Sequence, residues 1–407
     1  MGAIGGIVDF RNCNIDFSVF NSMRRAETLR GRKGSVAYLD SGVGMFYNSD
    51  EIFKSEQPII SKRRGYNTSL VIDSPLFDGR LALEGYRAYG VEFVGMLDIS
   101  FALALYDSER RMLLLARDKK GKKPLYYTVK EGKVYFSSEA KGILEIRKQS
   151  VNVNRQMLSA HLTSPIGIYG AADIYTDVFE VRCGECILFT DLGMSKFFYR
   201  ENSHKKITSK ASLKFNERAV EPFFEVDRDI VLSSLEDSLI AFDIPQFDSY
   251  MPSLCQLFSK ADKEQNKVFQ FKDFQKRQSL SYSYEREDRL SAFYGKAGVG
   301  VMVKGDESEY ENIGNEKIKL VQILTDAFFS IDRNGMLLLR KIFGDAKMNY
   351  LLCIFDKNFE NKKRKEDTEF IIRILGMIYQ TIELSKLREL EFLPEEKKMY
   401  SYVSNNN

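Results

Sequence analysis

Short apolar segments rich in β-branched and aromatic residues occupy the first half of the chain. They predict strands over residues 3–10, 69–73, 101–106, 112–116, 133–137 and 186–190. Two segments among them predict helices, at 17–29 and at 80–89, and the second one ends against Gly90 as a glycine cap would. Many short strands with few helices predict a layered sheet domain.

The pattern becomes helical after a polar stretch. Residues 200–217 are rich in Ser, Lys and Asn, which indicates an interdomain linker. Beyond it, apolar residues at three- and four-residue spacing predict helices over 228–242, 253–261, 317–329, 335–343 and 367–390. We therefore expect a sheet domain over 1–198, a linker over 199–218, a second segment over 219–315 and a helical region over 316–407.

Composition narrows the class of protein. A length of 407 residues predicts two or three domains, and 44% hydrophobic with 29% charged residues is typical of a soluble globular protein. The 60 basic and 57 acidic residues give a net charge of +3, which favours neither nucleic acid nor a membrane as a partner. Without a signal-like segment or a long apolar run, we expect a cytoplasmic protein whose five cysteines are reduced thiols.

Three motifs predict local structure instead of a ligand site. Cys183 and Cys186 have the spacing of a zinc ligand pair but lack a second pair, so we expect a turn followed by a buried strand. Residues 330–341 resemble a calcium loop but end in Lys341, which favours a link between two helices. Residues 295–300 are glycine-rich without the lysine of a P-loop. We predict no metal.

Several short sequence motifs occur in a fixed order along the first 141 residues. They are the start MGAIGG, Arg30 followed by Gly31, residues 77–90 and 101–107, and the stretches ARDKKGKKPLYY at 116–127 and FSSEAK at 136–141. In order and spacing they resemble the glutaminase half of asparagine synthetases, which are class II glutamine amidotransferases. The resemblance implies an α+β N-terminal-nucleophile (Ntn) hydrolase fold, an αββα sandwich of two facing sheets with helices outside.

The resemblance also implies a catalytic site that this chain has lost. Family members attack glutamine with the thiol of the residue after Met1, and here that residue is Gly2. The family's Asn-Gly-Glu loop, which supplies an oxyanion donor, has no counterpart that we can identify here, because 71–75 runs almost directly into Asp78; we therefore expect that the loop is deleted. Arg30 matches the residue that holds the glutamine carboxylate, and Asp78 matches the one that holds its amino group. An arginine before glycine is also explained as a brace for a turn.

The second half resembles a truncated synthetase domain of the α/β adenine-nucleotide-hydrolase-like type. Residues 232–238 replace a glycine-rich ATP loop and read as one face of a helix, and 267–273 replace a second glycine-rich loop. Asp243 and Asp248 match an acidic motif and are candidates for a residual synthetase site, although solvation or helix capping is the more ordinary explanation for either aspartate. ATP and Mg would be expected only if that site survived, so we predict no cofactor.

Two functions from different classes follow. The leading hypothesis is a non-catalytic, asparagine synthetase-like binding or scaffold protein that takes glutamine, another amino acid, a protein partner or a second copy of itself. The alternative is an asparagine synthase (glutamine-hydrolysing)-type ligase that works with a partner or with free ammonia. A third interpretation, that Gly2 replaces a native cysteine, leaves the missing loop unexplained.

Overall fold

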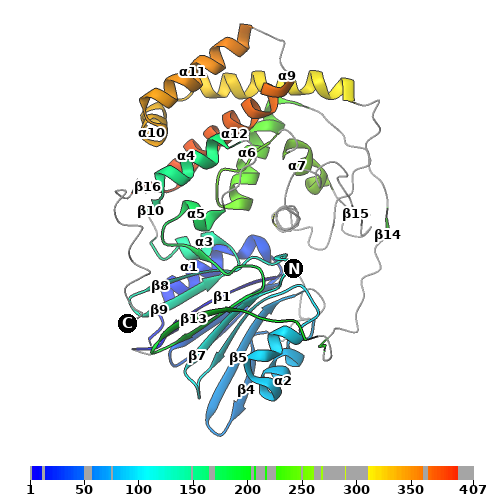
Figure 1. Ribbon diagram of the computed structural model, residues 1–407, viewed down its shortest axis with the longest axis vertical. Helices are drawn as coiled ribbons and strands as arrows, with labels where there is room; N and C mark the ends of the chain where they lie inside the picture. Colours follow the sequence, from blue (N-terminus) through cyan, green and yellow to red (C-terminus); the bar gives the residue numbers. More distant parts are fainter. Residues whose placement is uncertain are drawn as a thin grey trace.

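The computed structural model describes residues 2–11, 14–49, 57–74, 77–147, 150–164, 170–202, 206–207, 216–217, 226–248, 251–260, 267–268, 289, 310–360 and 365–392. Two six-stranded antiparallel sheets stack face to face in the first half, and helices of the second half lie above them (Figure 1).

The first sheet has the strand order β11-β8-β9-β1-β3-β2, and the second has the order β13-β12-β7-β6-β5-β4. The strands of the first are β1 (Gly2–Asp9), β2 (Gly34–Asp40), β3 (Val43–Ser49), β8 (Tyr126–Lys130), β9 (Lys133–Ser137) and β11 (Phe179–Glu180). Those of the second are β4 (Ile59–Arg63), β5 (Tyr66–Asp73), β6 (Ala102–Asp107), β7 (Met112–Arg117), β12 (Glu185–Thr190) and β13 (Gly193–Phe198).

Alternation along each strand builds the layers. On β1, Ile4 and Val8 pack in the cluster between the two sheets with Val71 and Leu113, whereas Ile7 packs on the other side in the cluster that contains the helices. The second sheet behaves likewise, because Leu70 and Leu103 face a third cluster with its own helix. The predicted sandwich with helices on both outer faces is therefore confirmed.

Short helices cover the two outer faces. On the first sheet lie α1 (Phe17–Ala26) and α3 (Ala140–Leu144), and on the second lie α2 (Gly79–Tyr89) and the 3₁₀ helix η2 (Gly90–Met96). Gly90 ends α2 with φ of 59°, as predicted. The helix predicted over 17–29 is too long, because residues 28–30 form a separate 3₁₀ turn, η1 (Thr28–Arg30), that brings Arg30 into the interior.

The predicted helices of the second half are present, with one more that the pattern missed. The predicted helices are α6 (Arg228–Phe242), α7 (Met251–Lys260), α9 (Tyr310–Phe329), α10 (Arg333–Phe343) and α12 (Lys365–Leu387). The helix that was not predicted is α11 (Asp345–Glu360). The short strands β14 (Asn216–Glu217) and β15 (Lys267–Val268) pair with each other. No helix in the described residues is long and apolar enough to cross a membrane.

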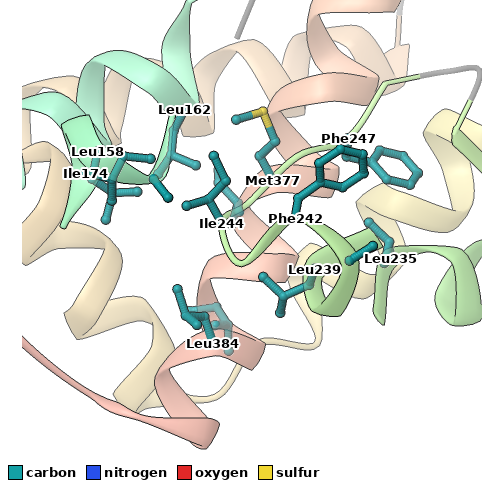
Figure 2. Packing of buried hydrophobic residues seen from close by; sticks show 14 of the residues in the cluster. Leu158, Leu162, Ile174, Leu235, Leu239, Phe242, Ile244, Phe247, Met377 and Leu384 are labelled. Carbon is teal, nitrogen blue, oxygen red and sulfur yellow. The ribbon is translucent and has the colours of Figure 1, made fainter. Parts of the chain in front are cut away.

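One apolar cluster joins these helices to the first half of the chain. Figure 2 shows Leu158 and Leu162, from α4 (Arg155–Thr163), facing Leu239 of α6 and Met377 of α12. The same cluster includes α5 (Ala171–Ile174) and the outer face of the first sheet. The helical half is thus packed directly on the sandwich, while the predicted domain limits stay predictions.

A parallel strand pair ties the end of α12 to the sandwich. Strands β10 (Ser150–Val153) and β16 (Glu389–Phe392) pair along their whole length. The predicted helix over 367–390 is therefore wrong at its C-terminal end. Arg388 donates to the Glu145 carboxylate at 2.7 Å, and Leu390 is buried, so the chain leaves the helix to pair with β10.

The first residues of the predicted linker lie against the sandwich. The amide of Asn202 donates to Gly95 O at 2.8 Å, and the amide of Ile207 donates to Met96 O at 2.7 Å. These bonds hold residues 202 and 207 beside η2. Most of the remaining linker residues lie outside the described part of the chain.

Candidate functional site

Gly2 lies where the resemblance places the nucleophile, and the space beside it is filled. The residue begins β1 and lies opposite Ser49 of the neighbouring strand β3. A Cβ built on Gly2 would lie 2.5–2.6 Å from three atoms of the Tyr47 side chain. Real Cβ atoms do not make contacts this short, so the outer end of the Tyr47 ring would have to move before a side chain fitted at position 2.

The carboxylate of Asp73 lies against the Gly2 backbone. Asp73 ends β5, is buried, and accepts from the Gly2 amide at 3.2 Å. An ionised carboxylate only accepts hydrogen bonds and carries negative charge, so it would repel a tetrahedral oxyanion instead of stabilising it. Sequence reasoning missed this residue, although an acidic residue at the end of the apolar run 70–72 was a signal for it.

Arg30 is held by protein groups on several sides. Its Nε donates to Gly2 O at 3.1 Å, its Nη2 donates to Asp73 Oδ2 at 3.2 Å, and its Nη1 lies 3.7 Å from a Glu139 carboxylate oxygen. Lys123 adds a second cation 3.8 Å from Asp73. The Arg30 side chain is 0% exposed, so the guanidinium that the resemblance assigns to a ligand carboxylate is already engaged by internal carboxylates.

Asp78, the other predicted ligand residue, has a different environment. It is exposed and caps α2, with its side chain accepting from the Arg80 amide at 3.0 Å. The structure therefore places Arg30 in the interior and Asp78 at an exposed helix start. The predicted loop deletion involves residues 75–76, which lie outside the described part of the chain.

Buried charges continue from Arg30 to the helical half. Lys141, in α3, lies 2.6 Å from a Glu139 oxygen and 3.4 Å from an Asp243 oxygen, and Arg289 lies 3.8 Å from Asp243. Burial opposes the charge on Lys141, yet Asp243 and Glu139 together hold its pKa above the ordinary value. Burial also opposes the charge on Glu139, but Lys141 and the two arginines lower its pKa. We call these groups, with Asp73, Lys123 and Glu27, the buried charge network.

Glu27 is the carboxyl of this network that keeps its proton at neutral pH. Burial and the nearby charge of Glu139 raise its pKa from 4.5 to about 8. Its Oε1 accepts from the Ser137 hydroxyl and, at 2.9 Å, from the Glu139 amide. A neutral Glu27 beside an ionised Glu139 avoids two adjacent buried negative charges.

The two aspartates predicted for a residual synthetase site, Asp243 and Asp248, lie next to helix ends and bond to groups of this chain. Asp243 ends α6 with a left-handed φ of 65°, is buried, and accepts from the Lys141 amide at 3.1 Å. Burial raises its pKa despite the neighbouring cations. Asp248 is half-buried before α7, where its carbonyl accepts from the Met251 amide at 3.1 Å. The carboxylate of Asp243 thus faces cations of this chain itself.

Residues 232–238 lie inside α6, which confirms the prediction of a helix. Ser234 and Ser238 are buried, and their hydroxyls donate at 2.7 Å to Val231 O and Ser234 O. Backbone amides inside a helix are bonded to carbonyls of the preceding turn, so this segment cannot cradle a phosphate as an open loop does. The glycine-rich residues 295–300 lie outside the described part of the chain.

The Cys183–Cys186 motif and the motif at 330–341 form turns and helix links, as predicted. Cys186 is buried in β12 after a turn at Gly184, and burial raises the pKa of its thiol to about 12, which leaves it unreactive. Residues 330–332 link α9 to α10, and Asp332 caps α10 with a bond from the Gly335 amide at 2.8 Å. Among the described residues, no group of three or more His, Cys, Asp or Glu side chains could hold a metal ion.

A pocket of about 250 Å³ lies on the second sheet's side of the domain, between the loop 97–100 and residues 118–120. Four of its charged side chains form two ion pairs, Lys206 with Asp98 at 2.7 Å and Lys119 with Glu201 at 3.4 Å. It is mixed in charge and is lined by neither Gly2 nor Arg30.

Comparison with known proteins identifies part of this domain. Residues 75–200 match the glutamine amidotransferase domain family. Asparagine synthetase [glutamine-hydrolyzing] 3 of Bacillus subtilis is 26% identical over 165 residues, 40% of this chain and 25% of that protein. Amidase chyE of Penicillium rubens is 40% identical over 67 residues, 16% of this chain and 10% of that protein. The chain thus spans between a tenth and about a quarter of these relatives.

Solved structures give a weaker likeness. Glutamine phosphoribosylpyrophosphate amidotransferase of B. subtilis has a TM-score of 0.35 at 9% identity, over 77% of this chain and 70% of that one. The family match begins after Ser74 and so covers α2 and strands β6 to β13, but not the strand that carries Gly2. The chain thus contains a glutamine amidotransferase domain over residues 75–200, and its N-terminal part is similar to asparagine synthetases.

Proposed function

We propose that this chain is a non-hydrolysing member of its family, in which the glutaminase site has become structural and the protein acts as a binding or scaffold protein. The observation that carries the proposal is the environment of Gly2. No thiol is present at that position, and the Tyr47 ring fills the space in which one would lie.

The groups around Gly2 support the same conclusion. Hydrolysis needs a nucleophile and a donor for the oxyanion, and the neighbouring Asp73 side chain is an acceptor. Substrate binding needs a cation that can meet the ligand carboxylate, and Arg30 instead meets Asp73 and Glu139. Loss of nucleophile, donor and free cation together is the pattern of a site converted to internal packing.

Glutamine hydrolysis by the purified chain tests this proposal. We expect no glutamate release from wild type, from Gly2→Cys, or from Gly2→Cys combined with Tyr47→Gly, which opens the space for the thiol. Release by wild type would overturn the proposal outright. Release by the double variant alone would mean that only the nucleophile and its space had been lost, and would limit the role that we assign to Asp73.

Ligand binding is tested separately by thermal denaturation. A ligand present at 100 times its Kd stabilises the folded state by about 2.7 kcal/mol. We expect glutamine, glutamate, asparagine and aspartate to leave the transition unchanged. A glutamine-dependent rise in Tm that Asp78→Ala removes and Glu84→Ala, in the same helix, preserves would show that an amino-acid pocket survives.

A further inference from the structure

Strand β2 forms an outer edge of the first sheet. It pairs with β3 on one side over seven consecutive residue pairs without a bulge, and no strand in the described part of the chain pairs with its other side. Most of its side chains are exposed, including Val36 at 51% and Leu39 at 44%. Its outer backbone amides and carbonyls therefore offer a ready template for another strand.

The three other edges of the two six-stranded sheets carry the features that normally prevent such pairing. The edge strand β4 contains Lys62 and Arg63, β13 contains Lys196, and β11 is only two residues long. Lysine side chains and short length are the usual protection of free edges. By contrast, β2 contains no Lys, Arg or Pro, and its one charged residue is Asp40 at its end. The exposed edge without protection is thus the long, regular one.

The sequence of β2 is complementary to itself in an antiparallel arrangement. If two copies pair along all seven residues, Ala37 lies opposite Ala37, and each Val36 lies opposite the partner's Tyr38, a favourable β-branched and aromatic pair. Lys33 precedes the strand, so the basic start of one copy lies next to the acidic end of the other. The side chain of Asp40 accepts bonds that lower its pKa, led by the one from the Tyr38 hydroxyl, so it is negatively charged.

We propose that two copies of this chain associate through β2, joining their first sheets into one continuous antiparallel sheet. The occupant of the edge is thus a second copy, selected by the charge complementarity of its two ends and by the Val36–Tyr38 pairs. This association is independent of whether the chain hydrolyses glutamine.

Sedimentation of the full chain over an about hundredfold range of concentration tests the proposal. We expect wild type to shift reversibly from 46.9 kDa toward twice that mass as concentration rises. Ala37→Lys places like charges directly opposite each other at the centre of the pair, so we expect this variant to stay monomeric. Val129→Lys is the matched control, because Val129 is 50% exposed on β8, which lies near the opposite end of the same sheet from β2, and this variant should associate like wild type.

Hydrogen exchange locates the contact. Within residues 35–39, the amides directed away from β3 should become protected as concentration rises in wild type and not in Ala37→Lys, with both proteins giving the same circular dichroism spectrum. A wild type that stays monomeric throughout, an Ala37→Lys variant that dimerises as wild type does, or a dimer without added protection in β2 would each overturn the proposal.

Discussion

Replacing Arg30 by Met distinguishes a ligand-binding arginine from a structural one. The two side chains are similar in length, so the change removes the charge while leaving most of the volume filled. In the structure, the lost guanidinium would leave Asp73 without its closest cation, at 3.2 Å, and would leave Gly2 O without the Nε donor. Glu139 would also lose one of the cations that lower its pKa.

The size of the effect follows from burial. Removing one partner of a buried ion pair costs about 3–5 kcal/mol, because the remaining charge stays desolvated. For a cooperative unit of about 150–250 residues, each kcal/mol lowers Tm by about 2–4 °C. We therefore expect Arg30→Met to lower Tm by about 6–20 °C. A second change, Asp73→Asn, should recover part of the loss because it removes the unpaired carboxylate.

Urea and thermal unfolding of the single and double variants measure this prediction. The matched control is Arg32→Met, two residues away and exposed, which should change stability by less than about 0.5 kcal/mol. If Arg30→Met were as stable as the control, the arginine would not be a structural element. Its assignment to a ligand carboxylate would then be the better interpretation.

Three further predictions concern buried polar groups. The folded-state pKa of Glu27, about 8, is above its ordinary value of 4.5, so its contribution to stability is lost as pH rises through that window. The stability of Glu27→Gln relative to wild type, measured by urea unfolding, should therefore rise from about pH 5 to about pH 9, and a constant difference would contradict the assignment. Burial lowers the pKa of His161 from 6.5 to about 4. The free energy of unfolding of wild type should therefore fall as pH decreases through that range, and this fall should be absent in His161→Gln. Acid-unfolding curves that run parallel for the two proteins would contradict this. The buried side-chain oxygen of Gln380 accepts from the backbone amide of Gln246 at 2.6 Å. Gln380→Ala should therefore lower the free energy of unfolding by about 1–3 kcal/mol. An unchanged urea midpoint would show that the backbone amide finds another partner.

The central strands of the sandwich were predictable because they are apolar on at least one face. The runs at 101–106 and 112–116 became β6 and β7 with nearly the predicted bounds. Strand β2 was not predicted, because most of its residues are exposed and no apolar run marks it. The end of α12 was missed for a different reason: only pairing with the distant β10 makes residues 389–392 extended.

The candidate site was predictable in its positions but not in its partners. Gly2 and Arg30 were identified from short motifs, yet nothing local indicates that Arg30 is buried against Asp73, 43 positions later. Glu27 is bonded to Ser137, 110 positions away, and its raised pKa arises from that burial. A single sequence shows which residues can ionise, whereas burial by distant elements decides whether they do.

The long-range closure by β10 and β16 has a consequence for synthesis on the ribosome. Arg388, just before β16, bonds to Glu145, just before β10, across 243 positions of chain. At about 5–20 residues per second, translation needs about 10–50 s to cover that distance. For most of this interval the sandwich strands up to Phe198 have been synthesised, but β10 and the apolar surface beneath α12 have no cover. A chaperone that recognises exposed apolar strands has its opportunity in this interval, and slow codons in the intervening segment would lengthen it.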